Sequence, residues 1–496
     1  MKPDAGNYEN IKISTSLSEN IQNIKNILDG SCDLLFNEVI ISGHKAAYLT
    51  CEAMVSTSLL PELVFHPLMN LNLGANSGPN KVIEAMNSTL IICTEKANEN
   101  KYGNIIIRLL SGFIIFFVDG ADQAVAIGAQ GFEKRGIDEP SSEINLNGSH
   151  EGFVETIRVN MSLIRRKMKT PYLKFEMFKL GSKSKTDICL AYLRDRVSMK
   201  MINSIKKKLE KTDLETILSS GYIEPFLEGK RRGIFPNIST TERPDKICSK
   251  LIEGRAALIV DGTPFVIIIP YLFAENFQTI DDYSQKPYYV TFIRIVKYAA
   301  FLISMLLPGV YVGIANFHPE LINSTLLINL AESENGVPFP LALEAIVVLI
   351  AYELIREAGL RLPKAVGGTV SIIGGFIIGD AAVQSGLIST PLLIAVAFAA
   401  TAAFVIPNLY QPITIFRMLF VVAGGLGGLY AIALLFAVVI MNVCSMEDFG
   451  IPATAPISPL TLKSMSDIFT RAGFQKLQKR NILISNLNGA DNEVEE

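Results

Sequence analysis

The sequence has no tryptophan, and only four histidines and six cysteines occur among its 496 residues. The histidines lie far apart without metal-ligand spacing, so no metal site is expected. The cysteines form no CxxC pair and predict no disulfide framework. A P-loop, a kinase signature and a nucleophile elbow are also missing. We therefore expect no catalytic residue, no cofactor and no enzymatic activity.

The charge balance does not indicate a nucleic-acid partner. The chain has 45 basic and 48 acidic residues, for a net charge of -3. One basic cluster, Arg165, Arg166, Lys167 and Lys169, ends an amphipathic segment at residues 151–169. No set of aromatic residues for base stacking accompanies it. We interpret it as a solvated helix end and expect no binding of nucleic acid.

The apolar residues are concentrated in one part of the chain. Mean hydropathy is +0.33, and almost all long apolar runs fall between residues 292 and 444. This distribution predicts a soluble region followed by a membrane domain. We divide the chain into a polar lead-in, a first α/β subdomain, a helical and second α/β subdomain, a membrane domain, and a C-terminal helix with a disordered tail. The expected boundaries are 1–30, 31–140, 141–290, 291–445 and 446–496.

A strand–turn–strand pattern occurs twice in the soluble region. Residues 112–120 read GFIIFFVDG, and residues 254–262 read GRAALIVDG with the same spacing. An apolar strand follows each Asp-Gly pair, which is typical of a hairpin turn. The repeat indicates two related α/β subdomains, although chance similarity between two buried hairpins is an alternative. The predicted fold class is an α/β N-terminal region of two related subdomains followed by an α-helical polytopic membrane domain.

Charge asymmetry suggests how the membrane domain is oriented. The first 20 residues lack the apolar core of a signal peptide. Arg294 and Lys297 lie at the start of the first apolar run, so this end is expected in the cytosol with the N-terminal region. The C-terminal region is also basic, which favours the same side. We expect spans at about 292–315, 341–359, 391–407 and 418–443, and a possibly re-entrant segment at 366–380 that leaves the C-terminus in the cytosol.

Glu344, Glu353, Arg356 and Asp380 are charged residues within the apolar stretch at residues 338–406. A charge at mid-membrane costs about 2.5–3.5 kcal/mol on insertion scales, so such groups usually face protein or a water-filled path. Glu344 and Glu353 are nine residues apart, about 180° around a helix, and cannot both face one lumen. Glu353 is the first candidate for a pore and Glu344 the second. The alternative is an amphipathic helix lying at the membrane interface.

Small residues recur at every fourth position in two segments. Gly367, Ser371, Gly375 and Gly379 form one stripe, and Gly424 and Gly428 repeat the spacing. Such stripes let another helix backbone approach closely. We expect both to be helix-packing surfaces.

Several longer segments resemble one family, the A subunits of bacterial spore germinant receptors (the GerA family), over roughly residues 30 to 465. The segments that carry the resemblance are EGFVETIRVNMSLIRRKMK at 151–169, SGYIEPFLEG at 220–229, TERPD at 241–245, EGRAALIVDGTPFVIIIP at 253–270, LLPGVYVGIANFHPELI at 306–322, GVPFP at 336–340, ELIREAGLRLPKAVGGTVSIIGGFIIGDAAVQSGLIS at 353–389 and FGIP at 449–452.

The resemblance implies a multi-pass receptor of the inner spore membrane with its N-terminal domain in the cytosol. It implies a permease-like B subunit and a lipoprotein C subunit as partners, and a homo-oligomer in the lipid bilayer. It also implies a ligand-gated channel for monovalent cations that opens on nutrient sensing. The residues alone leave two alternatives open: a secondary transporter and a non-conducting membrane scaffold of the receptor.

Overall fold

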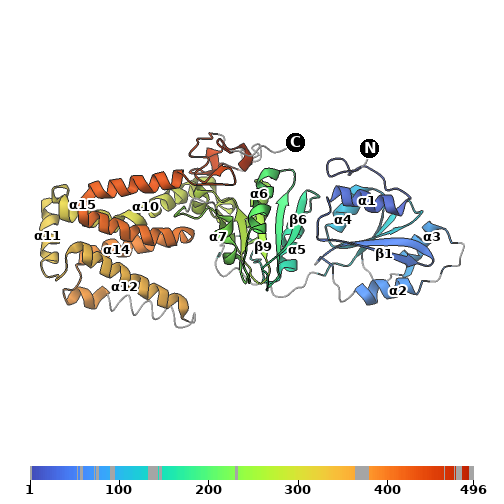
Figure 1. The fold of residues 1–496 in the computed structure, drawn as a ribbon, viewed down its shortest axis with the longest axis horizontal. Helices are drawn as coiled ribbons and strands as arrows, with labels where there is room; N and C mark the ends of the chain where they lie inside the picture. Colours follow the sequence, from blue (N-terminus) through green and yellow to red (C-terminus); the bar gives the residue numbers. More distant parts are fainter. Residues whose placement is uncertain are drawn as a thin grey trace.

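The chain folds into three bodies arranged along one long axis, as the computed structural model shows (Figure 1). Two α/β units lie at one end and in the middle, and a bundle of helices lies at the other end. The structure describes residues 3–52, 54–55, 60–71, 73, 77–89, 95–131, 143, 148–228, 233–362, 379–462, 464–473, 475 and 483–490.

The first unit is a five-stranded sheet with helices on both faces. Its antiparallel strands lie in the order β1-β2-β4-β5-β3. Strand β4 is buried along its whole length, as its run of six apolar residues predicts. The elements are α1 (Leu17–Ile27), β1 (Leu34–Ile41), β2 (His44–Cys51), η1 (Pro61–Phe65), α2 (His66–Met69), α3 (Pro79–Thr89), β3 (Lys96–Glu99), α4 (Tyr102–Leu109), β4 (Phe113–Val118) and β5 (Ala124–Gly128).

The second unit repeats this topology, which confirms the prediction of two related subdomains. Its sheet has the order β6-β7-β9-β10-β8, the same as the first with each strand replaced by its counterpart. The elements are α5 (Ile157–Lys167), β6 (Leu173–Leu180), β7 (Thr186–Leu193), α6 (Met199–Glu210), η2 (Ser220–Tyr222), α7 (Glu224–Leu227), β8 (Ser239–Thr241), α8 (Pro244–Ile252), β9 (Ala256–Val260) and β10 (Val266–Ile269).

The Asp-Gly turns of the repeat hold equivalent helices in place. The Asp119 carboxylate accepts a hydrogen bond from the backbone N–H of Leu17, at the start of α1, at 3.0 Å. The Asp261 carboxylate accepts one from Ile157, at the start of α5, also at 3.0 Å. A carboxylate at a helix N-terminus is stabilised by the unpaired N–H groups there. The repeat therefore extends back to α1.

The first 30 residues take part in the first unit. Tyr8 and Ile13 are buried with α1 in one core, and Lys12 bridges to Lys101. The short helix expected in this segment is α1. The polar lead-in thus contributes apolar side chains to the core of the first unit.

Arg165 corrects the interpretation of the basic cluster as a solvated helix end. Its side chain is 1% exposed and pairs with the Asp33 carboxylate of the first unit at 2.9 Å. It also donates to the Leu173 carbonyl at 3.1 Å. Arg166 and Lys167 pair with Glu151 instead. The amphipathic spacing identified the helix but not the contact, because the partner lies 132 residues away in sequence.

Apolar helices form the third body. They are α10 (Pro287–Phe317), α11 (Ser324–Glu334), α12 (Leu341–Arg361), α14 (Thr390–Ala403) and α15 (Tyr410–Cys444). Among the described residues, α10 and the segment Pro407–Cys444 are long and apolar enough to cross a membrane, and α14 is shorter. Residues 341–359, expected as a span, are helical in α12, but α12 is not among the helices that meet this criterion, and its crossing of a membrane stays a prediction.

Helix α15 reverses direction, which corrects the single span expected at 418–443. Its backbone is not helical at Gly427 and Gly428, where Gly428 has a φ of 59°. Phe416 stacks on Phe235 at 5.5 Å, while Asn442 accepts a hydrogen bond from the neighbouring Ile234 at 3.3 Å. A straight helix would separate residues 416 and 442 by about 39 Å. Residues 410–426 and 429–444 are therefore antiparallel.

This reversal brings the C-terminal region back to the second unit. Ile451, Ala455, Ile484 and Leu487 are buried in the same core as β9. The expected re-entrant segment at 366–380 lies outside the described residues except for its last two. The helix expected after Leu460 is not seen in residues 464–473, which hold only the 3-10 turn Met465–Asp467.

Candidate functional site

Glu344 lies in the first turn of α12 and is fully enclosed. Its side chain is 1% exposed, and its carboxylate accepts hydrogen bonds from the Ser389 N–H at 2.6 Å and the Ser389 hydroxyl at 2.8 Å. Ser389 is the N-cap residue that immediately precedes α14. Glu344 thus completes the N-terminus of α14, where a negative charge is favourable.

Glu353 lies on the opposite side of α12 and contacts α15. Its carboxylate accepts hydrogen bonds from the Tyr410 hydroxyl at 2.8 Å and from the Arg417 guanidinium at 2.9 Å. The Arg417 side chain is 1% exposed, whereas that of Glu353 is 23% exposed. The nine-residue spacing therefore places α12 between two helices, with one carboxylate directed to each.

Arg356 adds a second guanidinium to this site. Its Nη1 atom lies 3.6 Å from the Glu353 carboxylate, and its guanidinium lies 3.4 Å from the centre of the Tyr410 ring, a cation–π contact. Two arginines thus share one carboxylate. The formal charge of this cluster is +1, so Glu353 is more than neutralised in this conformation.

The other charged and small-residue candidates are distributed elsewhere. Asp380 is exposed in the helical residues 379–384, where Gly379 is half-buried. Gly367, Ser371 and Gly375 lie outside the described residues, so their packing role stays a prediction.

Gly424 and Gly428 lie where α15 meets α10. A side chain on Gly424 would overlap the backbone of Gly309, and one on Gly309 would lie 2.5 Å from the Phe420 carbonyl oxygen. Gly428 lies against Phe317. The two helix backbones are therefore in direct contact along this seam.

Sequence reasoning missed Arg417, Tyr410 and Ser389, the partners of the two carboxylates. A signal for Arg417 was present, because it is the only lysine or arginine between residues 366 and 444. A lone charge in an apolar segment needs a partner of opposite sign. Tyr410 and Ser389 carried no comparable signal.

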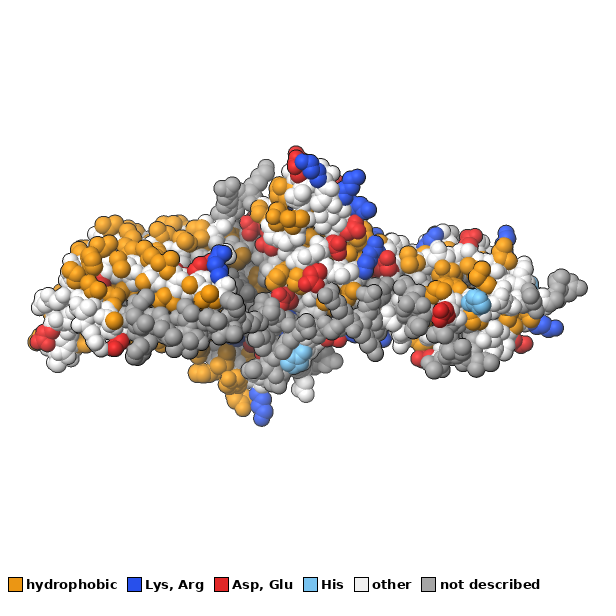
Figure 2. Space-filling view, turned by 90° about the horizontal axis from the view of Figure 1, so that it is seen from below, with side chains coloured by type: hydrophobic (Ala, Val, Ile, Leu, Met, Phe, Trp, Pro, Cys, Tyr) orange, Lys and Arg blue, Asp and Glu red, His pale blue; other side chains and the backbone are white. Residues whose placement is uncertain are grey.

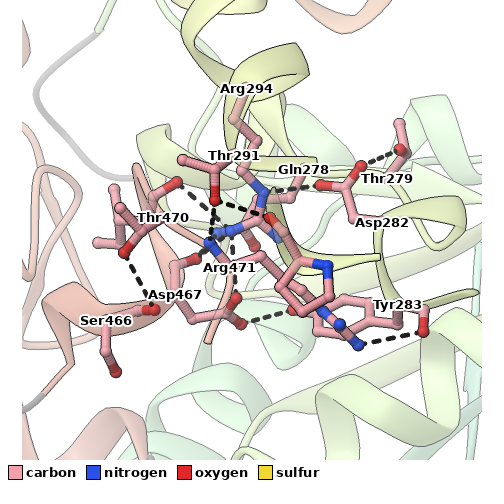
Figure 3. Close-up of polar contacts among 12 residues, drawn as sticks. Gln278, Thr279, Asp282, Tyr283, Thr291, Arg294, Ser466, Asp467, Thr470 and Arg471 are labelled. Carbon is pink, nitrogen blue, oxygen red and sulfur yellow. Dashed lines mark hydrogen bonds and ion pairs between the residues drawn. The ribbon is translucent and has the colours of Figure 1, made fainter. Parts of the chain in front are cut away.

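A second polar cluster joins the start of α10 to the preceding residues 278–283 and to the C-terminal segment (Figure 3). Arg294 is fully buried and donates to Asp282 at 2.8 Å and to Asp467 at 3.1 Å. The Tyr283 hydroxyl donates to Asp467 at 2.7 Å, and burial beside this carboxylate raises the pKa of Tyr283. Arg471 donates to the Tyr283 carbonyl. The cluster fixes the start of α10 to the C-terminal segment.

Asp448, just after the C-terminus of α15, holds the helical domain to the second unit. It follows α15 in β11 (Glu447–Asp448), which pairs with β12 (Ile451–Pro452). Its Oδ1 lies 3.7 Å from Lys208 Nζ. Burial raises the pKa of Asp448 from 3.8 to about 6, although Lys208 opposes this.

The raised pKa of Asp448 predicts a pH-dependent stability. Folding favours the protonated form of Asp448. Its contribution to the free energy of unfolding is therefore complete below pH 3.8 and is lost as the pH rises through about 6. The difference corresponds to about 3 kcal/mol. We expect Asp448→Asn to raise the thermal unfolding temperature at pH 7.5 but not at pH 4, measured by circular dichroism of the full chain in detergent. An equal shift at both pH values would contradict this role.

The surface of the helical domain is apolar on the face seen in Figure 2, while charged side chains gather over the α/β units. In the most apolar 18-residue stretch of each helix, only 39% of the residues of α10 and 17% of those of Pro407–Cys444 are buried. Apolar surface of this extent marks contact with membrane or with other proteins.

Comparison with known proteins identifies the family. The family model described as Bacillus/Clostridium GerA spore germination protein matches residues 22–483. The chain belongs to the GerA family. It is 36% identical to spore germination protein KA of Bacillus subtilis (strain 168), over 95% of this chain and 87% of that protein. It is 31% identical to spore germination protein B1 of the same organism, over 95% of this chain and 97% of that protein.

Two further matches of this GerA-family chain are to a membrane protein and a solved structure. The uncharacterized membrane protein YfkQ of Bacillus subtilis (strain 168) is 34% identical over 96% of this chain and 93% of that protein. The crystal structure of the N-terminal domain of the A subunit of the Bacillus megaterium spore germinant receptor GerK3 matches with a TM-score of 0.43 and 29% identity, covering 53% of this chain and 98% of that chain. Membership of the GerA family assigns the chain a role in spore germination.

Proposed function

We propose that this chain is the A subunit of a nutrient-germinant receptor and forms a ligand-gated channel for monovalent cations. Several copies would assemble in the inner membrane of the spore, together with a permease-like B subunit and a lipoprotein C subunit. Nutrient sensing would open the channel and start germination. Family membership and the exposed apolar helix faces support this assembly.

The observation that carries the proposal is the partly exposed carboxylate of Glu353 among apolar helices. Glu344 is enclosed by α14, but 23% of the Glu353 side chain remains exposed. One such carboxylate from each copy would form a ring, and rings of acidic side chains select cations. Glu353 is therefore the group that we propose lines the path, and Glu344 is the group that supports the helix packing.

The packing of the C-terminal region supports the proposed orientation. The chain before α10 and the chain after α15 both belong to the second unit, because Ile484 and Leu487 lie in its core. The helical domain therefore begins and ends at the same side. Arg294 and Lys297 near the start of α10 favour the cytosol for that side, which corresponds to the spore core.

Replacing Glu353 by glutamine is expected to lower the preference for cations over anions. The change removes the negative charge that would attract cations in the conducting state. The measurement is the reversal potential of receptor-containing bilayers, or potassium and chloride release from spores in which this receptor is the only one produced. We expect at least about a tenfold fall in the permeability ratio, which corresponds to about 1.4 kcal/mol.

Glu344→Gln is the matched control, because it makes the same change on the same helix at an enclosed carboxylate. It is expected to reduce stability but to leave ion selectivity unchanged. If neither variant alters ion flow, the chain is better described as a scaffold of the receptor. A purified chain that stays monomeric in lipid, by native mass measurement, would also contradict the proposed channel.

A further inference from the structure

Helix α12 is packed along only half of its length. All of its buried residues lie between residues 341 and 349: Leu341, Glu344, Ala345, Val348 and Leu349. None of residues 350–361 is buried, and Leu354 and Leu360 are 67% and 66% exposed. A segment with few buried contacts opens at low free-energy cost. The second half of α12 is thus the less stable part.

The contacts of Glu353 fasten this second half to the bundle. The Tyr410 hydroxyl reaches both carboxylate oxygens, at 2.8 and 3.0 Å, and Arg417 reaches one at 2.9 Å. Tyr410 and Arg417 both belong to α15. The Arg417 side chain is 1% exposed. A buried guanidinium that loses its carboxylate is left uncompensated, so separating Glu353 from Arg417 costs free energy.

The same contacts prevent Glu353 from acting as a cation-selecting charge. Its carboxylate faces two guanidinium groups, and the cluster has an excess of one positive charge. A ring of such clusters would repel cations rather than attract them. A conducting state that uses Glu353 therefore requires its separation from Arg417.

We propose that the Glu353–Tyr410–Arg417 contact is a latch that holds the second half of α12 against α15 in the non-conducting state. Release of the latch swings this half of α12 away, with its first half as the fixed end. The first half stays anchored through Glu344 and Ser389. This inference rests on the proposed channel function, because it assigns a gating role to the same carboxylate.

The test uses two variants that weaken the latch without touching the Glu353 charge. Tyr410→Phe removes the hydroxyl but keeps the ring that contacts Arg356, and Arg417→Gln removes the buried guanidinium. We expect both to raise nutrient-independent potassium release from spores at least about tenfold. Tyr430→Phe is the matched control, because it removes a hydroxyl from an exposed tyrosine of the same helix, 74% exposed, and should change nothing.

Hydrogen exchange of residues 350–361 in the full chain in lipid provides a readout that is independent of conduction. A latch predicts faster exchange there in Tyr410→Phe than in Tyr430→Phe, with no change at residues 341–349. Unchanged exchange in Tyr410→Phe would overturn the latch. Faster exchange without any ion release would keep the latch and refute the proposed channel function, so the two failures are distinguishable.

Discussion

The variant Gly424→Ala is expected to break the contact between α10 and α15. The added methyl group would overlap the carbonyl oxygen of Gly309, which is backbone and cannot rotate away. The two helices must then separate along the whole seam. We expect a loss of at least about 3 kcal/mol in the free energy of unfolding, the upper part of the range for overpacked sites. Thermal unfolding and the yield of folded protein in detergent measure this effect.

Gly379→Ala is the control for this change. Gly379 is also a helical glycine of the apolar region, but the nearest atom to an added methyl group is Leu393 Cδ2 at 3.9 Å. Alanine stabilises an exposed helix relative to glycine by up to about 1 kcal/mol. The control should therefore be neutral or more stable. Equal losses in both variants would show that close packing at Gly424 is not the cause.

The variant Arg165→Met is expected to separate the two α/β units. It leaves the Asp33 carboxylate buried, with the Ser31 hydroxyl at 2.6 Å and the Cys51 thiol at 3.8 Å as its remaining side-chain hydrogen-bond donors. Removing one partner of a buried ion pair costs about 3–5 kcal/mol, because the other charge stays uncompensated. We expect a lower urea midpoint for the full chain, measured by circular dichroism. Adding Asp33→Asn to Arg165→Met should recover part of the loss.

An exposed ion pair of the same region provides the comparison for Arg165. Lys183 and Glu215 pair at 2.6 Å, and both side chains are 70% exposed. Such pairs contribute between 0 and about 1 kcal/mol, because water and salt screen them. Lys183→Met should therefore barely change the urea midpoint. A large effect there, or none in Arg165→Met, would contradict the importance of burial.

Local sequence patterns were sufficient to predict the strands and turns of the repeat and the opposite faces of α12. The two GxxxxxVDG segments have the spacing of a strand and its turn, and both form the central hairpin of a five-stranded sheet. The nine-residue spacing of Glu344 and Glu353 placed them on opposite sides of a helix, and the structure finds a different neighbouring helix on each side. These results depend only on the periods of strand and helix.

Contacts between residues far apart in the chain could not be predicted from local sequence patterns. Arg165 has the sequence context of a solvated helix end, yet its partner Asp33 belongs to the other unit. Gly427 and Gly428 lie in a continuous apolar run that predicts one span, yet the chain reverses there. Glycine permits the reversal through its positive φ, but a glycine pair does not by itself indicate whether a helix continues.

The sequence by itself determined the division into an α/β region and an apolar helical region, the internal repeat and the family, because each is written in local composition and spacing. Only the tertiary structure decided which groups face the carboxylates of α12 and how the C-terminal region returns to the second unit. Those features depend on contacts between segments far apart in the chain, where neither hydrophobic periodicity nor residue type specifies the partner.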